Sequence, residues 1–367
     1  MKSVCASALL LATAAVGFTA DYQPPRTGFD FPIYTNQPLG RQIMANQLPA
    51  TTPALSPEET RKLIQVPPGF EVRLFAAEPM VVNPVAMTWD ERGRLWVVEL
   101  YEYPKGAPKG EKGRDRIKIL EDTDADGVAD KVTVFADGYS LATGIALGNG
   151  GVYLGQAPHL YFLEDTNGDD KMDKQTILKT GFGMEDRHEL LNGFAWGPDG
   201  WLYMTHGVFT HSKVRDPDAH DPDGFGVQMD AALARFHPAT KKFEVFADGT
   251  SNPWGVDWNE RGDAFVSACV IQHLFHMAPG GQYNRQGGKW ANPYGYVGDL
   301  PSKGLPAIVD FRHYRAAHAG IAIYQGDQWP AEWRGLVFLG NIHQSALNVD
   351  RLTPVGSTYK GERESTL

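Results

Sequence analysis

The sequence predicts an all-β protein with a β-propeller fold, and three observations support this prediction. One pattern recurs along the chain: an apolar segment, a turn that ends in glycine, and a second segment of alternating apolar residues, which is typical of a β-hairpin. Helical periodicity is missing from Phe70 onward. Glycine and proline supply 40 and 25 of the 367 residues, which indicates many short elements joined by tight turns.

The first residues predict an export signal, residues 1–20. A positive start, Met1-Lys2, precedes a short apolar run from Val4 to Val16, and small residues follow as far as Ala20. The run is too short to span a bilayer comfortably, and an N-terminal membrane anchor is the alternative. We therefore expect a periplasmic or secreted protein that has no transmembrane segment once the signal is removed.

The composition excludes two classes of protein. With 42% hydrophobic residues the chain can build a core, so it is not disordered as a whole. The formal net charge is −10 and lysines and arginines form no run, which argues against a nucleic-acid-binding surface.

Residues 21–65 predict an irregular lead that contains one short helix. Ser56 is a suitable helix cap, Pro57 suits the first turn, and Glu59 completes a capping box. The propeller is expected over residues 66–367.

Five copies of the hairpin pattern follow. Their turn glycines are Gly93, Gly150, Gly200, Gly262 and Gly335. Further strands fit between the hairpins at 116–120, 131–135, 234–236 and 243–246. Two hairpins per repeat make a four-stranded sheet, which is the blade of a propeller. The alternative is a set of unrelated hairpins in a β-sandwich.

Two acidic loops predict structural Ca²⁺ sites. The first places oxygen ligands at loop positions 1, 3, 5 and 9, namely Asp122, Asp124, Asp126 and Asp130. The second repeats the spacing with Asp165, Asn167, Asp169 and Asp173. Alternating oxygen ligands suit a hard cation, but Thr133 and Thr176 stand where an EF-hand needs glutamate, so these are not EF-hands. The alternative is a pair of aspartate-rich turns without metal.

Polar residues near the ends of predicted strands are candidates for a ligand site at one mouth of the propeller channel. Those that we expect to contact a sugar or polyol are Glu99, His206, Asn252, Arg312, His313 and His318. His273 and His276 are three residues apart, so on a regular strand they face opposite sides and do not form a chelating pair.

Several stretches resemble a known group of proteins. They are residues 68–79 (PGFEVRLFAAEP), 120–127 (LEDTDADG), 318–320 (HAG) with 324–330, and 340–343 (GNIH). In combination they resemble the N-terminal propeller of membrane-bound dehydrogenases of planctomycete and verrucomicrobial type, within the soluble quinoprotein glucose and sorbosone dehydrogenase superfamily. The resemblance implies six blades, whereas we count five repeats, so we expect a propeller incomplete at its C-terminus or a last blade completed by the N-terminal segment.

The resemblance also implies a function, an oxidoreductase module that acts on a sugar or alcohol and passes electrons to a cytochrome. His188 is similar to the histidine that serves as general base in the quinoprotein sugar dehydrogenases, ahead of a Gly-Pro-Asp turn. The implied cofactor is pyrroloquinoline quinone (PQQ), but Ser251 stands where those enzymes have an arginine that helps to hold it. Since the chain contains no Cys-x-x-Cys-His motif, we expect no covalent haem in it.

Whether the protein is an enzyme stays open at this point. A non-catalytic propeller that binds glycans or a protein partner is one alternative. A Ca²⁺-dependent propeller hydrolase is another.

Overall fold

The computed structural model describes residues 55–219, 226–269, 271–286, 304–313 and 317–367. The predicted export signal and the lead as far as residue 54 lie outside these residues. The strands described below belong to the compact unit that spans Pro49–Ser365. No helix among the described residues combines the length and the apolar character needed to cross a membrane.

The predicted helix is present as α1 (Pro57–Leu63). Ser56 caps it: the backbone N–H of Glu59 donates to the Ser56 hydroxyl, and the Glu59 carboxylate accepts from the Ser56 backbone N–H. This capping box satisfies two backbone donors that a helix start otherwise leaves unpaired.

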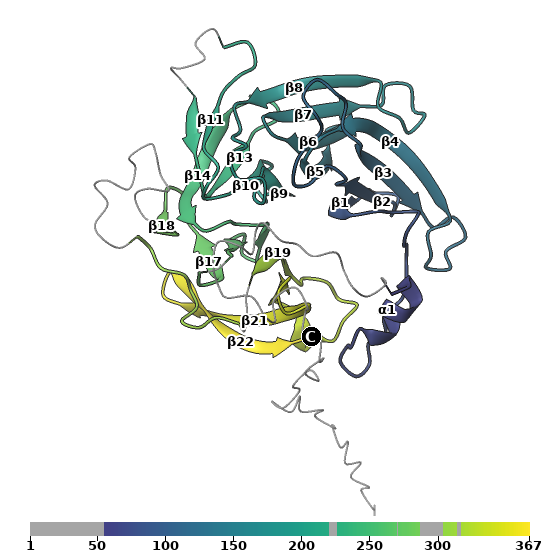
Figure 1. The fold of residues 1–367 in the computed structure, drawn as a ribbon. Coiled ribbons are helices and arrows are strands. Elements are labelled where there is room, and N and C mark those ends of the chain that lie inside the picture. Colours follow the sequence, from purple (N-terminus) through teal and green to yellow (C-terminus); the bar gives the residue numbers. More distant parts are fainter. Residues whose placement is uncertain (1–54, 220–225, 270, 287–303, 314–316) are drawn as a thin grey trace, which may run out of the picture. The chain divides into compact units, whose positions relative to one another are not determined.

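The strands form antiparallel sheets in chain order, as a propeller requires (Figure 1). The first sheet contains β1 (Pro84–Trp89), β2 (Leu95–Glu99), β3 (Asp115–Glu121) and β4 (Lys131–Tyr139). The second contains β5 (Ala142–Gly148), β6 (Gly151–Gln156), β7 (His159–Glu164) and β8 (Lys174–Thr180).

The third sheet is the most elaborate. It contains β9 (Asn192–Trp196), β10 (Leu202–His206), β13 (Ala232–Phe236) and β14 (Phe243–Thr250), and β18 (Gln282–Arg285) adds a parallel edge strand. A two-stranded ribbon of β11 (Ser212–Val214) and β12 (Val227–Met229) is inserted between β10 and β13.

Two further sheets complete the described strands. The fourth contains β15 (Val256–Trp258), β16 (Ala264–Ser267) and β17 (Leu274–Met277). The fifth contains β19 (His318–Ile323), β20 (Leu336–Asn341), β21 (Ala346–Val355) and β22 (Thr358–Thr366), with the short 3₁₀ helix η2 (Ala331–Trp333) before β20.

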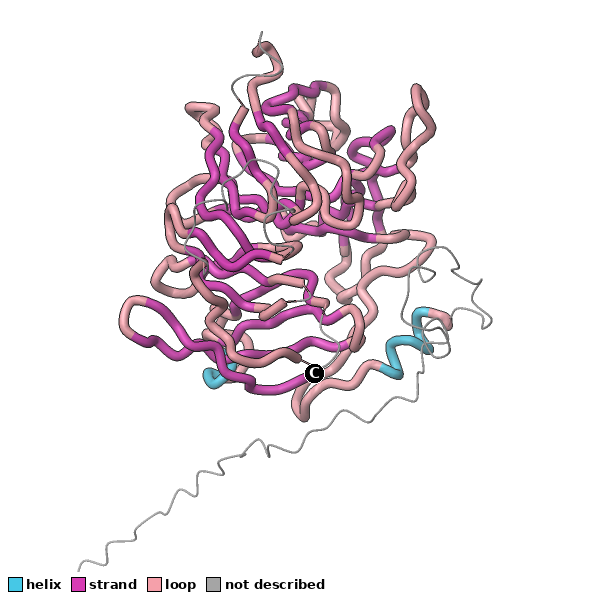
Figure 2. Tube along the Cα trace, turned by 60° about the vertical axis from the view of Figure 1, so that its left-hand side comes forward, coloured by secondary structure: helices cyan, strands magenta, loops and turns pink. Residues whose placement is uncertain are grey.

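The first strands of these sheets are neighbours at the centre of the unit. β1 lies next to β5, β5 next to β9, β9 next to β15, and β15 next to β19. Figure 1 shows the sheets following one another in this order, and Figure 2 shows that strands (magenta) and the loops that join them make up most of the described chain. The fold is therefore a β-propeller, and the sandwich alternative is wrong.

The repeated turns were predicted correctly. All five turn glycines have φ between 78° and 81°, a left-handed conformation that favours glycine over residues with a side chain. Each of the five precedes the second strand of its sheet. These glycines therefore determine where the first strand of each sheet turns back into the second.

The core lies between adjacent sheets. Leu274 and Phe265 of the fourth sheet pack against Val337 and Leu339 of the fifth, and all four side chains are fully buried. Burial of such side chains stabilises the fold by about 1.5–3 kcal/mol each. Apolar packing between adjacent sheets therefore holds one blade to the next.

Two tryptophans that stand just before repeated turns, Trp196 and Trp258, belong to this packing. Tyr153 of the second sheet meets Trp196 of the third edge to face, with ring centroids 5.4 Å apart. Tyr203 meets Trp258 of the fourth sheet in the same way at 5.1 Å. These indole rings are therefore occupied in blade packing.

The strand order also separates two edges of the propeller. Because each sheet is an antiparallel meander, the segment that enters a first strand lies at the same edge as the link between the second and third strands. We call this the site edge. The turn glycines and the links between third and fourth strands, which include both acidic loops, lie at the other edge, the turn edge.

Candidate functional site

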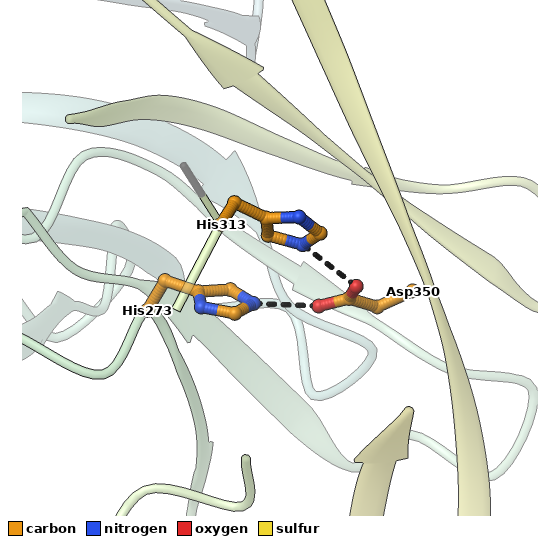
Figure 3. A group of neighbouring side chains, drawn as sticks. All are labelled: His273, His313 and Asp350. Carbon is orange, nitrogen blue, oxygen red and sulfur yellow. Dashed lines mark hydrogen bonds and ion pairs between the residues drawn. The ribbon is translucent and has the colours of Figure 1, made fainter. Parts of the chain in front are cut away.

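The most distinctive polar group of the described residues is a buried cluster of His273, His313 and Asp350 (Figure 3). His273 Nε2 lies 2.6 Å from Asp350 Oδ2, and His313 Nε2 lies 2.9 Å from Asp350 Oδ1. The two imidazoles therefore share one carboxylate, each contacting a different oxygen. The three residues are 0%, 4% and 0% exposed.

Three separate segments build this cluster between the fourth and fifth sheets. His273 directly precedes β17, His313 lies in the connection that leads to β19, and Asp350 lies within β21. The two histidines reach the carboxylate from the site edge. Asn348 stands two residues before Asp350, so the two side chains share one face of β21.

His318 and two asparagines extend the cluster. His318 Nε2 lies 3.0 Å from Asn348 Oδ1, and Asn341 Nδ2 donates to the same oxygen at 3.0 Å. The ring centroid of His318 lies 4.7 Å from that of His273. The result is a continuous polar network inside an otherwise apolar interface.

Burial and hydrogen bonding shift the pKa values of three ionisable groups in this network. Burial raises the pKa of Asp350, but the hydrogen bonds from His273 and His313 outweigh it, so this pKa lies below its ordinary value. Burial lowers the pKa of His273, although Asp350 opposes the change. Burial, with a smaller contribution from His273, lowers the pKa of His318 to about 4. A carboxylate that stays charged in the interior can attract a cation.

The sequence predicts only part of this network. His313 and His318 were predicted to be sugar ligands, and the structure places both in the interior, where they are 4% and 2% exposed. Asp350 and Asn348 were not predicted. The only signal for them was a pair of polar residues alternating within an otherwise apolar strand pattern.

His273 and His276 do not form a pair, as predicted. His273 contacts Asp350, whereas His276 Nδ1 lies 3.0 Å from Thr358 Oγ1 on β22.

His188, the predicted general base, lies apart from the buried cluster in the β8–β9 connection at the site edge. Its Nδ1 is 2.9 Å from Asp186 Oδ1, and its side chain is 54% exposed. Tyr103 meets the ring edge to face at 5.7 Å. Because the carboxylate orients Nδ1, Nε2 is directed away from that contact, and the described residues make no hydrogen bond to it.

The neighbouring Glu189 anchors this loop. Its side chain is buried, and its carbonyl oxygen accepts from the Gly207 backbone N–H at 3.1 Å. Burial, followed by the nearby Asp186, raises the pKa of Glu189 well above its ordinary value. The loop is thus fixed at Glu189 and presents His188 at the surface.

The other predicted ligands lie at separate places. Glu99 is buried in the first sheet, where Lys118 Nζ is 2.8 Å and Arg116 Nε 3.0 Å from its carboxylate. His206 is fully buried at the end of β10. Asn252 Oδ1 accepts from the Val208 backbone N–H at 3.0 Å.

Arg312 is exposed, and its carbonyl oxygen accepts a hydrogen bond from Arg363. The described structure therefore brings His313 and His318 together and leaves Glu99, His206, Asn252 and Arg312 outside their network.

The stretch expected to hold PQQ does not fit an anionic cofactor. Ser251 is fully buried, and its hydroxyl is hydrogen bonded to Gln286. The nearby Arg285 already pairs with Asp230 and Asp248. No described residue in this stretch offers a positive charge that lacks a partner, so we derive no step through PQQ.

The two acidic loops share one geometry. In the first, Asp122 accepts from the backbone N–H groups of Asp126 and Gly127, and Thr123 donates to Asp130. In the second, Asp165 accepts from Gly168 and Asp170, and Thr166 donates to Asp173.

The carboxylates of the first loop converge most closely. Asp122, Asp124 and Asp130 each bring an oxygen to within 4.8 Å of the others, and Asp126 is not part of this group. The second loop forms no such group among the described residues, although Asn167 and Asp169 accept from backbone N–H groups two residues further on, as Asp124 and Asp126 do in the first loop. Both loops belong to the turn edge, away from the buried cluster.

Three solved structures are similar to the chain at low sequence identity. The PQQ-bound aldose sugar dehydrogenase of Streptomyces coelicolor has a TM-score of 0.50 at 17% identity, over 77% of this chain and 81% of that chain. A protein of Thermus thermophilus described as an oxidoreductase (glucose dehydrogenase) has a TM-score of 0.51 at 17% identity, over 78% and 84%. A further glucose dehydrogenase has a TM-score of 0.50 at 18% identity, over 78% and 87%.

At this identity the likeness shows a shared fold. No curated protein matches the sequence. The family described as "Domain of unknown function (DUF7133)" matches residues 56–367, which is most of the chain, and the protein therefore belongs to that family.

Proposed function

We propose that the chain is an exported oxidoreductase module that oxidises a hydroxyl group of a sugar or alcohol and passes the electrons to a cytochrome. It would act in the periplasm or outside the cell. The propeller shared with sugar dehydrogenases supports the class of protein. The single observation that carries the proposal is the pair of His188 and Asp186 at the site edge.

This pair provides a ring nitrogen that can accept a proton and a carboxylate that orients the ring, as a general base requires. Oxidation of a hydroxyl-bearing carbon releases two protons and two electrons, and the hydroxyl proton must be accepted by the protein. Asp186 holds Nδ1 of His188 at 2.9 Å, which leaves Nε2 to accept that proton. The half-exposed ring is accessible to a polar substrate. The proton from the carbon is released to solvent, and the two electrons leave to the cytochrome, a one-electron acceptor that is therefore reduced twice for each substrate oxidised.

We also propose that the chain is the N-terminal propeller of a membrane-bound dehydrogenase of planctomycete or verrucomicrobial type. The acidic loops would each hold one structural Ca²⁺ ion. Matching carboxylate positions and matching Thr123–Asp130 and Thr166–Asp173 hydrogen bonds in two successive sheets support this assignment.

A non-catalytic propeller that binds glycans or a protein is the second candidate. The observation that favours it is the buried Ser251, which supplies no charge for a cofactor. A Ca²⁺-dependent hydrolase gains no support from the acidic loops, since they lie at the turn edge.

The test is a dye-reduction assay of the purified chain across a panel of sugars and alcohols, run in Ca²⁺ both with and without added PQQ. His188→Gln should lower kcat by about 100- to 10,000-fold, because a general base contributes that much. Asp186→Asn should lower kcat less, because His188 remains as the base and loses only the carboxylate that orients its ring. His237→Gln, in the link between β13 and β14 at the turn edge, is the matched control and should leave activity unchanged.

Two results would contradict the proposal. Full activity of His188→Gln would remove this residue as the base. Absence of activity on every substrate, together with absence of PQQ binding, would favour the binding propeller.

A further inference from the structure

The buried cluster of His273, His313 and Asp350 has no role in the proposed oxidation. Its histidines lie 77 and 37 residues from Asp350 in sequence and meet it through two ring nitrogens. The side chains of His273, His313 and Asp350 are 0%, 2% and 0% exposed. Burying these polar side chains in an apolar interface costs free energy, so a favourable interaction must compensate that cost.

Hydrogen bonding alone leaves the cluster incompletely satisfied. If both Nε2 atoms donate to Asp350, the Nδ1 atom of each ring becomes an acceptor. Nδ1 of His273 and Nδ1 of the adjacent His318 are buried and meet no hydrogen-bond partner among the described residues. Hydrogen bonds within the described residues therefore do not account for the whole cluster, although an ion held by the two Nε2 atoms would not contact these Nδ1 atoms.

Among the described residues, no lysine or arginine forms an ion pair with Asp350. Within the described residues, the ion-pair partners of Asp350 are His273 and His313 alone. The guanidinium of Arg363 lies over the Phe311 ring at 5.2 Å and donates to the carbonyl oxygen of Arg312. A bound cation would compensate the buried negative charge.

The ligand atoms are close enough to share one ion. One atom from each residue lies within 4.8 Å of the other two. An ion bound at about 2.0–2.2 Å from each would replace the two hydrogen bonds after small side-chain rotations. Imidazole nitrogens with a single carboxylate suit Zn²⁺, Co²⁺, Ni²⁺ or Fe²⁺, whereas Ca²⁺ prefers a shell of oxygens.

We propose that His273, His313 and Asp350 bind one divalent transition-metal ion of the Zn²⁺ class. His273 belongs to the fourth sheet and Asp350 to the fifth, so the ion ties these two blades together. Three protein ligands leave one tetrahedral position to a water molecule, and complete burial keeps substrate away from that position, so we assign the ion a structural role. The site differs in chemistry and in place from the oxygen-only loops at the turn edge.

The test uses the full chain, stripped with a chelator and then titrated with Zn²⁺ and, separately, with Co²⁺. The wild type should bind one equivalent of Zn²⁺ with a rise in Tm, and Co²⁺ should give visible d–d bands of a nitrogen–oxygen site. Asp350→Asn keeps the size of the side chain, but it removes the charge and replaces one of the two acceptor oxygens with an N–H donor. It should weaken Zn²⁺ affinity by more than about 100-fold, since even partners beyond the ligands change metal affinity 10- to 100-fold.

His276→Gln is the matched control, because His276 lies on β17, which begins directly after His273, and contacts Thr358 instead of the cluster. It should bind Zn²⁺ like the wild type. Zinc binding that persists unchanged in Asp350→Asn and in His273→Gln would overturn the assignment. A wild-type Tm that does not change when Zn²⁺ is added would also overturn it. If Asp350→Asn does not fold, His313→Gln and the Co²⁺ spectrum of the wild type decide the same question.

These readouts do not involve substrate oxidation. Zinc binding without activity would support the metal site and count against the proposed function, and the reverse result would do the opposite.

Discussion

At the scale of single residues, His206 is a titratable group held in the interior. Burial lowers its pKa from 6.5 to about 4, with smaller effects from the backbone of Thr210 and Gly183 and from the nearby His211. The folded state therefore favours the neutral ring. This contribution to stability is complete above about pH 6.5 and is lost as the pH falls toward 4.

We expect the free energy of unfolding to fall by about 2 kcal/mol through His206 between pH 7.5 and pH 5. Urea denaturation of the wild type and of His206→Gln at both pH values measures this. The variant should lose less stability on acidification than the wild type, although it starts lower. Equal pH dependence of the two proteins would show that His206 does not titrate in this range.

Residue identities predicted some contacts well and others poorly. The capping box of Ser56 and Glu59 was predictable because both partners lie within four residues. The role of Glu99 was not, because Lys118 and Arg116 reach it from the next strand of the sheet. A charged residue at a predicted strand end has the same sequence signature whether it contacts a ligand or an ion pair.

At the scale of elements, the two acidic loops link the third and fourth strands of successive sheets. We expect Ca²⁺ to raise the Tm, because an ion that binds only the folded loops stabilises the folded state. Asp124→Ala should weaken this rise through the first loop, and Asp169→Ala through the second. Differential scanning calorimetry with Ca²⁺ or with a chelator measures the rise.

The shift caused by Ca²⁺ is the quantity to compare, since the substituted carboxylates also accept backbone hydrogen bonds. Asp137→Ala, an exposed carboxylate of β4 outside the loops, is the control and should keep the full shift. A Tm that is indifferent to both Ca²⁺ and chelator would rule out the loop sites.

The elements themselves were largely predictable. The turn glycines, the two strands of each predicted hairpin and the strands at 116–120 and 131–135 all appear in the structure. Alternation of apolar residues and a glycine at the turn are local signals. The ribbon of β11 and β12 and the parallel edge strand β18 were missed, because their short segments carry no such pattern.

At the scale of the whole molecule, contacts between blades decide stability. Tyr359 on β22 packs its ring against Phe265 of the fourth sheet at 5.2 Å. Its hydroxyl accepts from Asn259 Nδ2 at 2.8 Å and donates to Asp263. One side chain thus joins the outermost strand of the fifth sheet to a turn of the fourth.

Tyr359→Ala should lower the free energy of unfolding by about 3–5 kcal/mol, because it removes a large buried ring at a blade interface. Tyr359→Phe should lower it by about 1–3 kcal/mol, since the ring stays and only the hydrogen bonds are lost. Urea denaturation at pH 7.5 gives both values. A loss for Phe as large as that for Ala would show that the ring packing contributes little.

The sequence by itself determined the all-β class, the positions of the repeated turns and the capped helix, since each depends on residues close together in the chain. Only the tertiary structure decided that His273, His313 and Asp350 meet, that His206 is enclosed, and that His188 stays at the surface beside Asp186. The physical reason is that burial and long-range contacts depend on how one blade faces the next. A histidine or aspartate at the end of a strand has no local signal for what lies across that interface.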